Sequence, residues 1–279
     1  MKPAPFAYVR ASSLEAALAA LAEGGDDAKP IAGGQSLVPA LNMRLVRPSV
    51  LVDIGRAGLD GITANGALRV GATTRQAALA GDDRVHPLVR RALPFVGHFV
   101  TRNRGTVGGS IAHADGAAEL PLCLVALGGS VVVDGPDGRR EIPAAEFFVT
   151  HFTTVLRPGE LVVETVWPRA AAGERSAFAE LALRAGDFAQ AMAAVLLRRD
   201  ATGGVVSASV AVGAVTDRPT RLHDVEELLV GAGGAEAAAE AGALAARLVD
   251  PPGSVHASPR YLRALTGTLV TRAIEEASS

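Results

Sequence analysis

Two loops that each contain a glycine pair restrict the fold of this chain more than any other feature. The first lies in the string AGGQSL at Ala32 to Leu37, and the second lies in TVGGS at Thr106 to Ser110. Because glycine has no Cβ, the backbone N–H groups of such loops can converge on a phosphate, and nearby Gln and Ser side chains add donors. Neither loop has the GxGxxG spacing of a Rossmann unit or the GxxxxGK spacing of a P-loop. A phosphate group would therefore be bound by a different fold.

Each loop also has an ordinary structural explanation. A Gly-Gly pair between a strand and a helix is most often only a turn. Asp115 and Glu119 follow the second loop, where a carboxylate could accept hydrogen bonds from ribose or ribityl hydroxyls. Glu119 could equally well favour the N-terminal turn of the next helix. The residues of the two loops leave these alternatives open.

Short strands and helices alternate through residues 1–175. Strands are predicted at 6–9, 30–32, 50–53, 68–71, 131–134 and 161–167, and helices at 14–22, 74–79 and 85–95. Ser12 and Glu15 have capping-box spacing ahead of the first helix. We expect a long polar loop from Thr101 to Asp115, and a linker at 168–175, which is rich in Ala, Gly and charge.

Residues 176–279 predict a small sheet covered by helices. Apolar residues alternate along 206–212, and the turn at Gly203-Gly204 connects this stretch to the apolar segment 189–197. The pattern indicates an antiparallel hairpin. Helices are expected at 225–229, 235–249 and 258–277, and the middle one is predicted mainly from the high helix propensity of alanine.

Charge and cysteine content exclude several kinds of site. The net charge is −2, and Lys and Arg are scattered, so there is no basic stripe for a nucleic acid. Cys123 is the only cysteine, and one thiol forms neither an internal disulfide nor an iron–sulfur cage. The six histidines show no HExxH motif or close Cys/His pairing, so we expect no metal site.

Two further features bear on location. The longest uncharged stretch, Leu120 to Val133, is too short to span a bilayer as a helix and contains Pro121. Near the N-terminus, Pro3, Pro5 and Arg10 interrupt the apolar region that a signal peptide would need. We therefore expect a cytoplasmic protein without a membrane span.

Three segments resemble a known family. The strings AGGQSLVPALNMRL at Ala32 to Leu45 and RNRGTVGGSIAHADGAAELP at Arg102 to Pro121 are similar to the two FAD-binding loops of the medium subunits of molybdenum hydroxylases, the carbon monoxide dehydrogenase and xanthine dehydrogenase family. Arg184 to Ala189 resembles the family's segment that carries an aromatic residue near the flavin ring. The segments occur in family order and at family spacing, and the similarity covers essentially the full chain.

The resemblance implies an α+β fold in two parts. Residues 1–175 would form a vanillyl-alcohol-oxidase-type FAD-binding domain of two α+β subdomains. Residues 176–279 would form a small C-terminal domain with an antiparallel sheet covered by helices. The cofactor would be FAD, and no residue of the chain would be a catalytic acid, base or nucleophile.

The resemblance also implies partners and a role. A small subunit with [2Fe-2S] clusters and a large subunit with the molybdenum cofactor would join this chain in a dimer of heterotrimers. Electrons would pass from the clusters through FAD to an external acceptor. The implied cofactor contacts are Ala32, Gly33, Gly34, Gln35, Ser36, Leu37, Thr106, Gly108, Gly109, Ser110, Asp115, Glu119, Leu161 and Phe188.

Two positions depart from the family pattern, and two other functions compete. Phe188 stands where many relatives have Tyr, and Gly116 replaces the usual Pro. His98 and His113 invite a proton-transfer role, although packing explains His113 better because FAD performs its own redox chemistry. A self-contained FAD-dependent oxidoreductase is disfavoured because 176–279 shows no dense cluster of titratable residues. A non-enzymatic scaffold is disfavoured because both glycine loops are intact.

Overall fold

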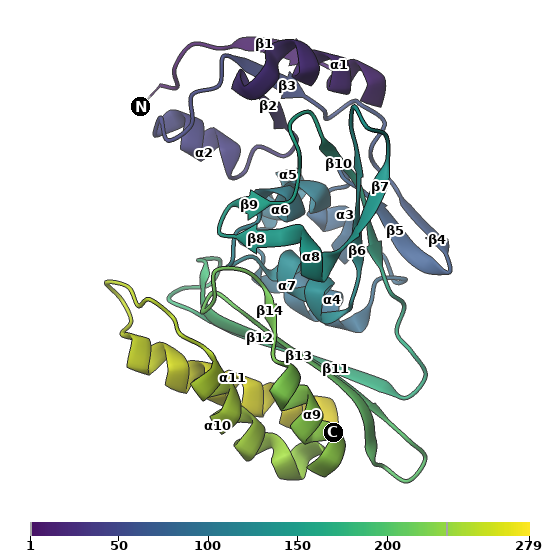
Figure 1. Ribbon diagram of the computed structural model, residues 1–279, viewed down its shortest axis with the longest axis vertical. Coiled ribbons are helices and arrows are strands. Elements are labelled where there is room, and N and C mark those ends of the chain that lie inside the picture. Colours follow the sequence, from purple (N-terminus) through teal and green to yellow (C-terminus); the bar gives the residue numbers. More distant parts are fainter. Residues whose placement is uncertain (1, 233) are drawn as a thin grey trace.

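Three β-sheets of three or more strands lie one after another along the long axis of the molecule (Figure 1). The computed structural model describes residues 2–232 and 234–279. The N-terminal sheet lies at one end, a five-stranded sheet with short helices lies in the middle, and a four-stranded sheet with long helices lies at the other end. This order follows the chain, except that β10 returns to the centre of the middle sheet.

The first sheet is parallel, with strand order β1-β3-β2. Parallel neighbours need a crossover connection, which residues 32–49 provide between β2 and β3, and a longer helix connects β1 with β2 at the two edges of the sheet. The cap of this helix is Ser13, whose side chain accepts a hydrogen bond from the Ala16 N–H at 3.1 Å, so the predicted cap at Ser12 was wrong by one residue. The elements are β1 (Ala7–Arg10), α1 (Leu14–Gly24), a 3₁₀ turn (Gly25–Asp27), β2 (Ala28–Ile31), α2 (Leu37–Asn42) and β3 (Val50–Asp53).

The second sheet is antiparallel, with strand order β4-β5-β10-β6-β7. Its strands are β4 (Ile62–Asn65), β5 (Ala67–Gly71), β6 (Ser130–Asp134), β7 (Arg140–Pro143) and β10 (Leu161–Trp167). The strand β4 was not predicted, because it lies at the sheet edge and most of its residues are exposed, which leaves no apolar alternation to detect. The predicted ranges of β3 and β10 agree with the structure.

Short helices and a small hairpin accompany the second sheet. They are α3 (Gln76–Ala80), α4 (Pro87–Ala92), a 3₁₀ turn (Leu93–Phe95), α5 (Phe99–Arg104), α6 (Val107–His113), α7 (Glu119–Ala126), α8 (Ala144–Phe147), β8 (Phe148–Thr150) and β9 (Thr153–Thr154). The expected loop from Thr101 to Asp115 is therefore mostly helical. Helix α6 forms despite its glycines because Thr106 caps it and because the Gly108 N–H donates to the Ala72 carbonyl at 2.9 Å.

The third sheet is antiparallel, with strand order β11-β12-β13-β14. The predicted hairpin is confirmed as β12 and β13, with Val195 paired to Val210. The strand β11 was not predicted, and it begins inside the expected linker at Glu174. The elements are β11 (Glu174–Ala182), β12 (Ala189–Arg199), β13 (Val205–Gly213), β14 (Thr220–Arg221), α9 (His223–Ala232), a 3₁₀ turn (Gly234–Ala237), α10 (Ala238–Leu248) and α11 (Pro259–Ser278).

Both faces of the third sheet are covered. On one face, residues such as Ala193 and Val195 join a core with helices α9, α10 and α11. On the other face, Met192 and Ala194 belong to the core that continues through α7 into the second sheet. Every residue of α7 is buried. This helix therefore ties the middle of the molecule to the C-terminal sheet.

A buried histidine makes a second connection between these parts. His86 caps α4, and its Nδ1 accepts a hydrogen bond from the Leu88 N–H at 3.1 Å. Its Nε2 lies 2.6 Å from Oε1 of Glu174, the first residue of β11. Because Nδ1 is used as an acceptor, the geometry assigns the ring proton to Nε2, which donates to Glu174.

Candidate functional site

The two glycine loops meet at Gly33. A Cβ placed on this residue would lie 2.4 Å from the carbonyl oxygen of Arg104 and 2.8 Å from the Cα of Gly105. Real Cβ atoms do not approach other atoms that closely, so this backbone contact requires glycine. The contact joins the loop after β2 to the turn between α5 and α6, which are far apart in sequence.

The first loop presents polar groups to solvent. Gly34 has a φ of +71°, a conformation that glycine adopts without strain. The Gln35 side chain donates to the Gly33 carbonyl at 3.3 Å and is exposed. Ser36 precedes α2 but makes no capping hydrogen bond with its side chain, and it is also exposed. The hydroxyl and amide groups of this loop are thus available to a ligand, whereas Ala32 and Leu37 are half-buried.

In the second loop, the predicted contact residues divide into two kinds. Thr106 is buried, and its Oγ1 accepts a hydrogen bond from the Gly109 N–H at 3.1 Å, so its oxygen caps α6. Gly108 packs against Ala72, where an added Cβ would lie 2.5 Å from the Ala72 Cβ. Gly109 and Ser110 are half-buried. We conclude that Thr106 and Gly108 shape this loop, while Gly109 and Ser110 are the members that face outward.

A third segment, Arg75 and Gln76 at the start of α3, supports the contact between the two loops. The Gln76 N–H donates to the Gly105 carbonyl at 3.0 Å, and the Arg75 guanidinium donates to the Arg104 carbonyl. A Cβ on Gly105 would lie 2.5 Å from Oε1 of Gln76. The Arg104-Gly105 turn is therefore held between Gly33 on one side and Gln76 on the other. Nothing in the sequence around Gln76 indicated this role, because the pairing of distant segments is a property of the fold.

The Gln76 side chain has an unusual environment. Only 5% of the residue is exposed, and its Oε1 is buried without a hydrogen-bond partner. Buried polar atoms are normally paired, so this oxygen, which packs against the Arg104-Gly105 turn, is an exception. The backbone approach at Gly33 and the exposed polar groups of Gln35 and Ser36 fit a phosphate-bearing and hydroxyl-bearing cofactor such as FAD.

Acidic residues follow the second loop. The Asp115 carboxylate accepts a hydrogen bond from the Ala117 N–H at 2.9 Å, which orders the turn before α7. Glu119 is the first residue of α7 and is 7% exposed. Burial raises its pKa to about 7, and the charge of Asp115 adds to this rise, whereas its own backbone N–H and Arg102 oppose it. At neutral pH, Glu119 is therefore only partly ionised.

A second carboxyl group lies close to Glu119 across the interface with the third sheet. Burial, followed by the charge of Glu119, raises the pKa of Glu180 to about 8. The Oε2 of Glu180 is buried without a partner. Burial, together with the charges of Glu119 and Glu180, also raises the pKa of the Cys123 thiol. Sequence reasoning missed Glu180, which lies on the unpredicted strand β11.

His98 and His113 both have packing roles. The rings of His113 and Phe152 lie 4.9 Å apart between centroids, and burial lowers the pKa of His113 against the opposing charge of Asp115. His98 precedes α5 and supports the turn after β11, because a Cβ on Gly186 would lie 2.5 Å from the His98 Cε1. The third family-like segment, Arg184 to Ala189, is thereby brought beside α5, whose last residue belongs to the turn that Gly33 contacts.

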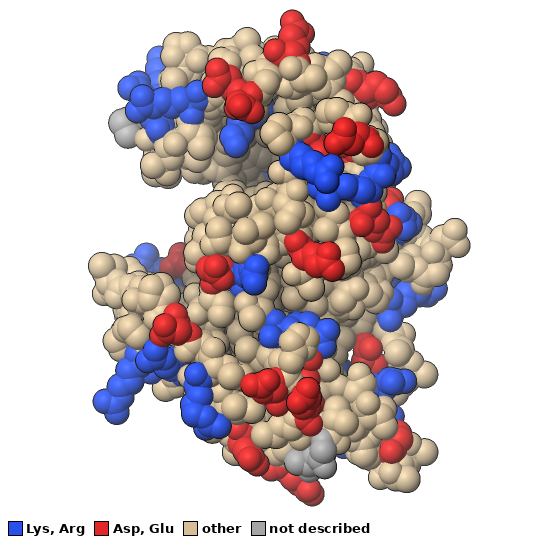
Figure 2. Space-filling view, in the orientation of Figure 1, with Lys and Arg blue, Asp and Glu red and all other residues tan. Residues whose placement is uncertain are grey.

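The structure does not place the remaining two predicted contacts, Phe188 and Leu161, in the contact between the glycine loops. Phe188 is 70% exposed in the turn between β11 and β12. Leu161 is 5% exposed and lies in the core between the first and second sheets, in the cluster that Ala32 packs against. Figure 2 shows a notch between the part that holds α2 and the part that holds β9, with few charged side chains on its walls in this view. The first loop runs into α2, which borders this notch.

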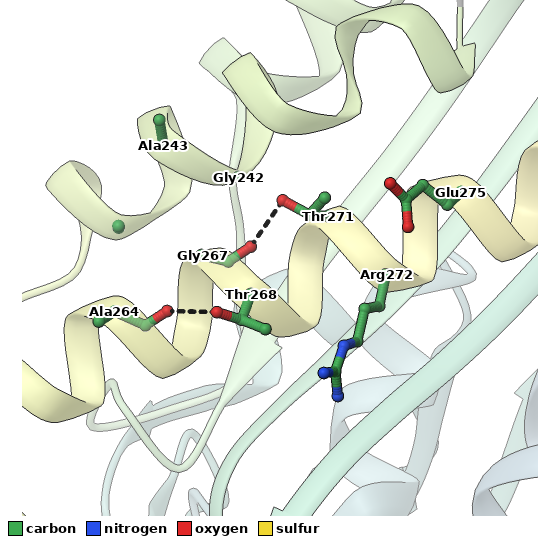
Figure 3. A pocket seen from close by; sticks show the side chains of 9 residues that line it. Gly242, Ala243, Ala264, Gly267, Thr268, Thr271, Arg272 and Glu275 are labelled. Atoms are coloured by element: carbon green, nitrogen blue, oxygen red, sulfur yellow. Dashed lines mark hydrogen bonds between the residues drawn. The ribbon is translucent and has the colours of Figure 1, made fainter.

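A separate groove of about 470 Å³ lies between α10 and α11 (Figure 3). The two helices approach each other closely at Gly242, where an added Cβ would lie 2.5 Å from the Gly267 carbonyl oxygen. The Thr271 hydroxyl donates to the Gly267 carbonyl at 3.0 Å within this groove. The groove lies on the face of the third sheet away from α7, so it is not part of the glycine-loop site.

Among the described residues, no group of three or more His, Cys, Asp or Glu side chains could hold a metal ion.

Comparisons with known proteins agree with this geometry. Residues 4–170 match the model of the FAD binding domain in molybdopterin dehydrogenase, and residues 176–277 match the CO dehydrogenase flavoprotein C-terminal domain. The 6-hydroxypseudooxynicotine dehydrogenase complex subunit alpha of Paenarthrobacter nicotinovorans is 41% identical, over 99% of this chain and 96% of that protein. The carbon monoxide dehydrogenase medium chain of Afipia carboxidovorans is 32% identical, over 100% and 99%.

Solved structures of two relatives are superimposable on this chain. A Cu,Mo-CO dehydrogenase chain has a TM-score of 0.95 at 32% identity and covers 100% of this chain and 99% of its own. A chain of quinoline 2-oxidoreductase from Pseudomonas putida 86 has a TM-score of 0.94 at 36% identity, with 100% and 98% coverage.

Proposed function

We propose, from the premise that this chain belongs to the family of FAD-binding molybdopterin dehydrogenase proteins, that it is the FAD-carrying electron-transfer subunit of a heteromeric molybdenum hydroxylase. The observation that most supports this function is the backbone contact of Gly33 with the Arg104-Gly105 turn. It joins the two family-like loops into one cradle, which an ordinary pair of turns would not do. The α+β fold expected from the sequence agrees with the family match.

Within this site, we assign the residues as follows. The backbone of Ala32 to Leu37, with Gly109 and Ser110, binds the pyrophosphate, and Thr106 and Gly108 set the shape of the second loop. Asp115 and Glu119 contribute polar contacts on the flavin side, and Phe188 covers the ring from the turn that His98 supports. Leu161 packs behind the first loop. We assign residues 1–175 to the FAD-binding domain and 176–279 to the C-terminal domain.

The chemistry comes from the cofactor, and the protein binds and orients it. Bound FAD supplies the exchange of single electrons with an iron–sulfur cluster and of one or two electrons with an acceptor. The chain contributes backbone donors at the glycine loops and a largely uncharged notch. The thiol of Cys123 is buried with a raised pKa, so it is an unreactive core residue.

The partners follow from the family. Relatives are named as a complex subunit and as medium chains of carbon monoxide dehydrogenase. We propose a small subunit with [2Fe-2S] clusters as the electron donor and a large subunit with the molybdenum cofactor as the hydroxylating part, arranged as a dimer of heterotrimers. No helix in the described parts of the chain has the length and hydropathy to cross a bilayer. A cytoplasmic location remains a prediction from the sequence.

The experiment is reconstitution of the purified chain. We expect one FAD to bind without a covalent bond and to be released into the supernatant on acid precipitation. We expect the bound FAD to be reduced when the reduced iron–sulfur subunit is added, and not when candidate substrates are added to the chain alone. Flavin that stays with the precipitate would contradict the noncovalent site. Turnover of a substrate by the lone chain would favour a self-contained oxidoreductase.

A further inference from the structure

Phe152 lies at the tip of the β8–β9 hairpin, next to the segment that follows the second glycine loop. It is the second of the two residues between Thr150 and Thr153, which pair across the hairpin. Its N–H donates to the carbonyl oxygen of Ala114 at 2.9 Å, and Ala114 is the C-cap of α6. The hairpin is therefore attached to the helix that begins in the second glycine loop, and Figure 1 shows it beside α6. Phe152 is not among the cofactor contacts assigned above.

The backbone conformation of Phe152 is unfavourable for a bulky residue. Its φ is +56°, in the left-handed region that glycine and asparagine adopt readily and aromatic residues rarely do. Glycine is the usual residue at the second position of a tight turn when φ is positive there. A phenylalanine at this position therefore costs stability, and such strain persists only where the surroundings or a function offset it.

Contacts of the Phe152 ring within the chain offset this cost only in part. The rings of His113 and Phe152 lie 4.9 Å apart between centroids at an interplanar angle of 39°, so His113 covers part of the phenylalanine ring. The ring of His151 is farther away, at 6.0 Å. Phe152 nevertheless remains 61% exposed. Because stabilisation grows with the apolar area removed from water, most of what this ring can contribute is not realised in the free chain.

The surroundings of the ring suit a flat aromatic ligand. FAD carries two planar aromatic rings, adenine and isoalloxazine, on either side of its pyrophosphate. Along α6, the rise from Gly109 in the glycine loop to His113 next to Phe152 is about 6 Å, at about 1.5 Å per residue. A sugar or a ribityl chain bridges a distance of that order. β9 lies across the notch from α2, and the walls of this notch carry few charged side chains in Figure 2, which favours an uncharged ring.

We propose that Phe152 is a stacking residue of the FAD site, and that the open part of its ring packs against one of the two planar rings of the dinucleotide. This inference rests on the proposed function, since it needs the pyrophosphate at the two glycine loops. The bound ring covers the exposed part of Phe152 and thereby offsets the strain of the turn. A phenylalanine that only packs on His113 would contribute equally to the free and the loaded chain.

The test is Phe152→Gly, measured in the full chain with and without FAD. We expect the melting temperature of the FAD-free protein to change by no more than about 2 °C, because relief of the strained φ balances the lost contact with His113. We expect the Kd for FAD, measured by flavin fluorescence, to rise about tenfold because the stacked pair is lost. Phe152→Tyr keeps the ring and should keep the Kd within about twofold of the wild type.

The matched control is Val149→Ser, which removes a 43% exposed apolar side chain from β8 of the same hairpin and should leave the Kd for FAD unchanged. Binding of ADP and of FMN then identifies the ring. Weaker binding of ADP by Phe152→Gly assigns the stack to the adenine, and weaker binding of FMN assigns it to the isoalloxazine. Wild-type affinity for both fragments would overturn the inference, as would a loss of FAD in Val149→Ser equal to that in Phe152→Gly.

An unchanged Kd for FAD in Phe152→Gly would also overturn the inference. If that variant instead binds the iron–sulfur subunit less tightly, the ring belongs to a protein interface. If Phe152→Gly does not fold, Phe152→Asn replaces it, since asparagine also tolerates a positive φ, and FAD should raise its melting temperature by less than it raises that of the wild type. An equal rise would contradict stacking. A wild-type chain that binds no FAD would overturn the proposed function, whereas equal FAD binding by wild type and variant overturns this inference alone.

Discussion

Single glycines decide whether the two loops can meet. At Gly33, even a methyl group would collide with the backbone of Arg104 and Gly105, which cannot move aside as a side-chain tip could. At Gly109, the added carbon would instead meet Oγ1 of Thr106 at 2.6 Å, the atom that caps α6. The first position therefore controls the contact between the loops, and the second controls the start of a helix.

We predict that Gly33→Ala abolishes FAD retention while the chain stays folded, because the cradle opens when the loops are pushed apart. Gly109→Val should also lose FAD, through loss of the cap. The control is Gly81→Ala, since a Cβ there makes only ordinary contacts of 3.7 Å and longer. Flavin content per folded protein is the measurement. Full occupancy in the Gly33 and Gly109 variants would mean that these loops are ordinary turns.

Glu119 and Glu180 make stability depend on pH. Burial raises the pKa values of both carboxyl groups, to about 7 and about 8, from an ordinary value of 4.5. Each group binds its proton more tightly in the folded chain than in the unfolded chain, so unfolding releases protons. Stability is then greatest at low pH with respect to these groups, and it falls as the pH rises from about 4.5 to about 8.

We predict that Glu180→Gln stabilises the protein at pH 9 and changes little at pH 5. The amide cannot ionise, so the free-energy cost of a buried charge beside Glu119 disappears. Because Glu180 is partly exposed, we expect a gain of only about 1 kcal/mol at the higher pH. Denaturant unfolding of the FAD-free chain at the two pH values is the measurement. A gain that is equal at both would show that ionisation is not the cause.

At the scale of elements, periodicity predicted those with strong patterns and failed at the others. The strands β3 and β10 and the β12–β13 hairpin carry apolar runs or alternation, and they were predicted. The strand β11 alternates weakly because both of its faces are covered, one by α4 and one by α11. The residues of the candidate site also fall into those that the sequence predicted and those that it did not. The loops could be identified from their glycines, whereas Gln76 and Glu180 could not, because only the fold brings them to these places.

Helix α4 depends on a cap that also connects two parts of the molecule. His86 satisfies the Leu88 N–H with one ring nitrogen and pairs with Glu174 through the other. We predict that His86→Asn is less destabilising than His86→Ala by about 1 kcal/mol, because asparagine is a good N-cap but is too short to reach Glu174. Thermal unfolding of the three proteins is the measurement. Equal losses in the two variants would mean that the cap contributes nothing.

At the scale of the whole molecule, exposed apolar residues gather beside the turn that follows β11. Phe99 and Val100 of α5 are 69% and 54% exposed, and Leu183 and Phe188 are 56% and 70% exposed. The contact of Gly186 with His98 brings the two groups together. Arg102 is occupied by hydrogen bonds to the carbonyls of Val96 and Gly97, which leaves Arg104 and Arg184, both exposed, as polar anchors at the edge of this patch.

We predict that the iron–sulfur subunit docks on this patch, because an electron must reach the flavin edge over a short distance. Amides near residues 101–116 and 184–189 should gain protection from hydrogen exchange when the partner is added. The double variant Phe99→Ser with Leu183→Ser should weaken this complex while leaving FAD content at α6 and the first loop intact. Protection confined to α11 would place the partner on the opposite side of the molecule.

Helix α7 has a further consequence during protein synthesis. All of its residues are buried, and part of the surface that buries them belongs to β12 and β13, which the ribosome makes later. Until those strands emerge, an apolar helix has no cover and can aggregate or recruit chaperones. We therefore expect FAD loading to be completed only after β12 and β13 of a newly made chain have been synthesised. A translation pause or a truncation before β13 would yield an insoluble fragment, so the cell obtains either the whole flavoprotein or none of it.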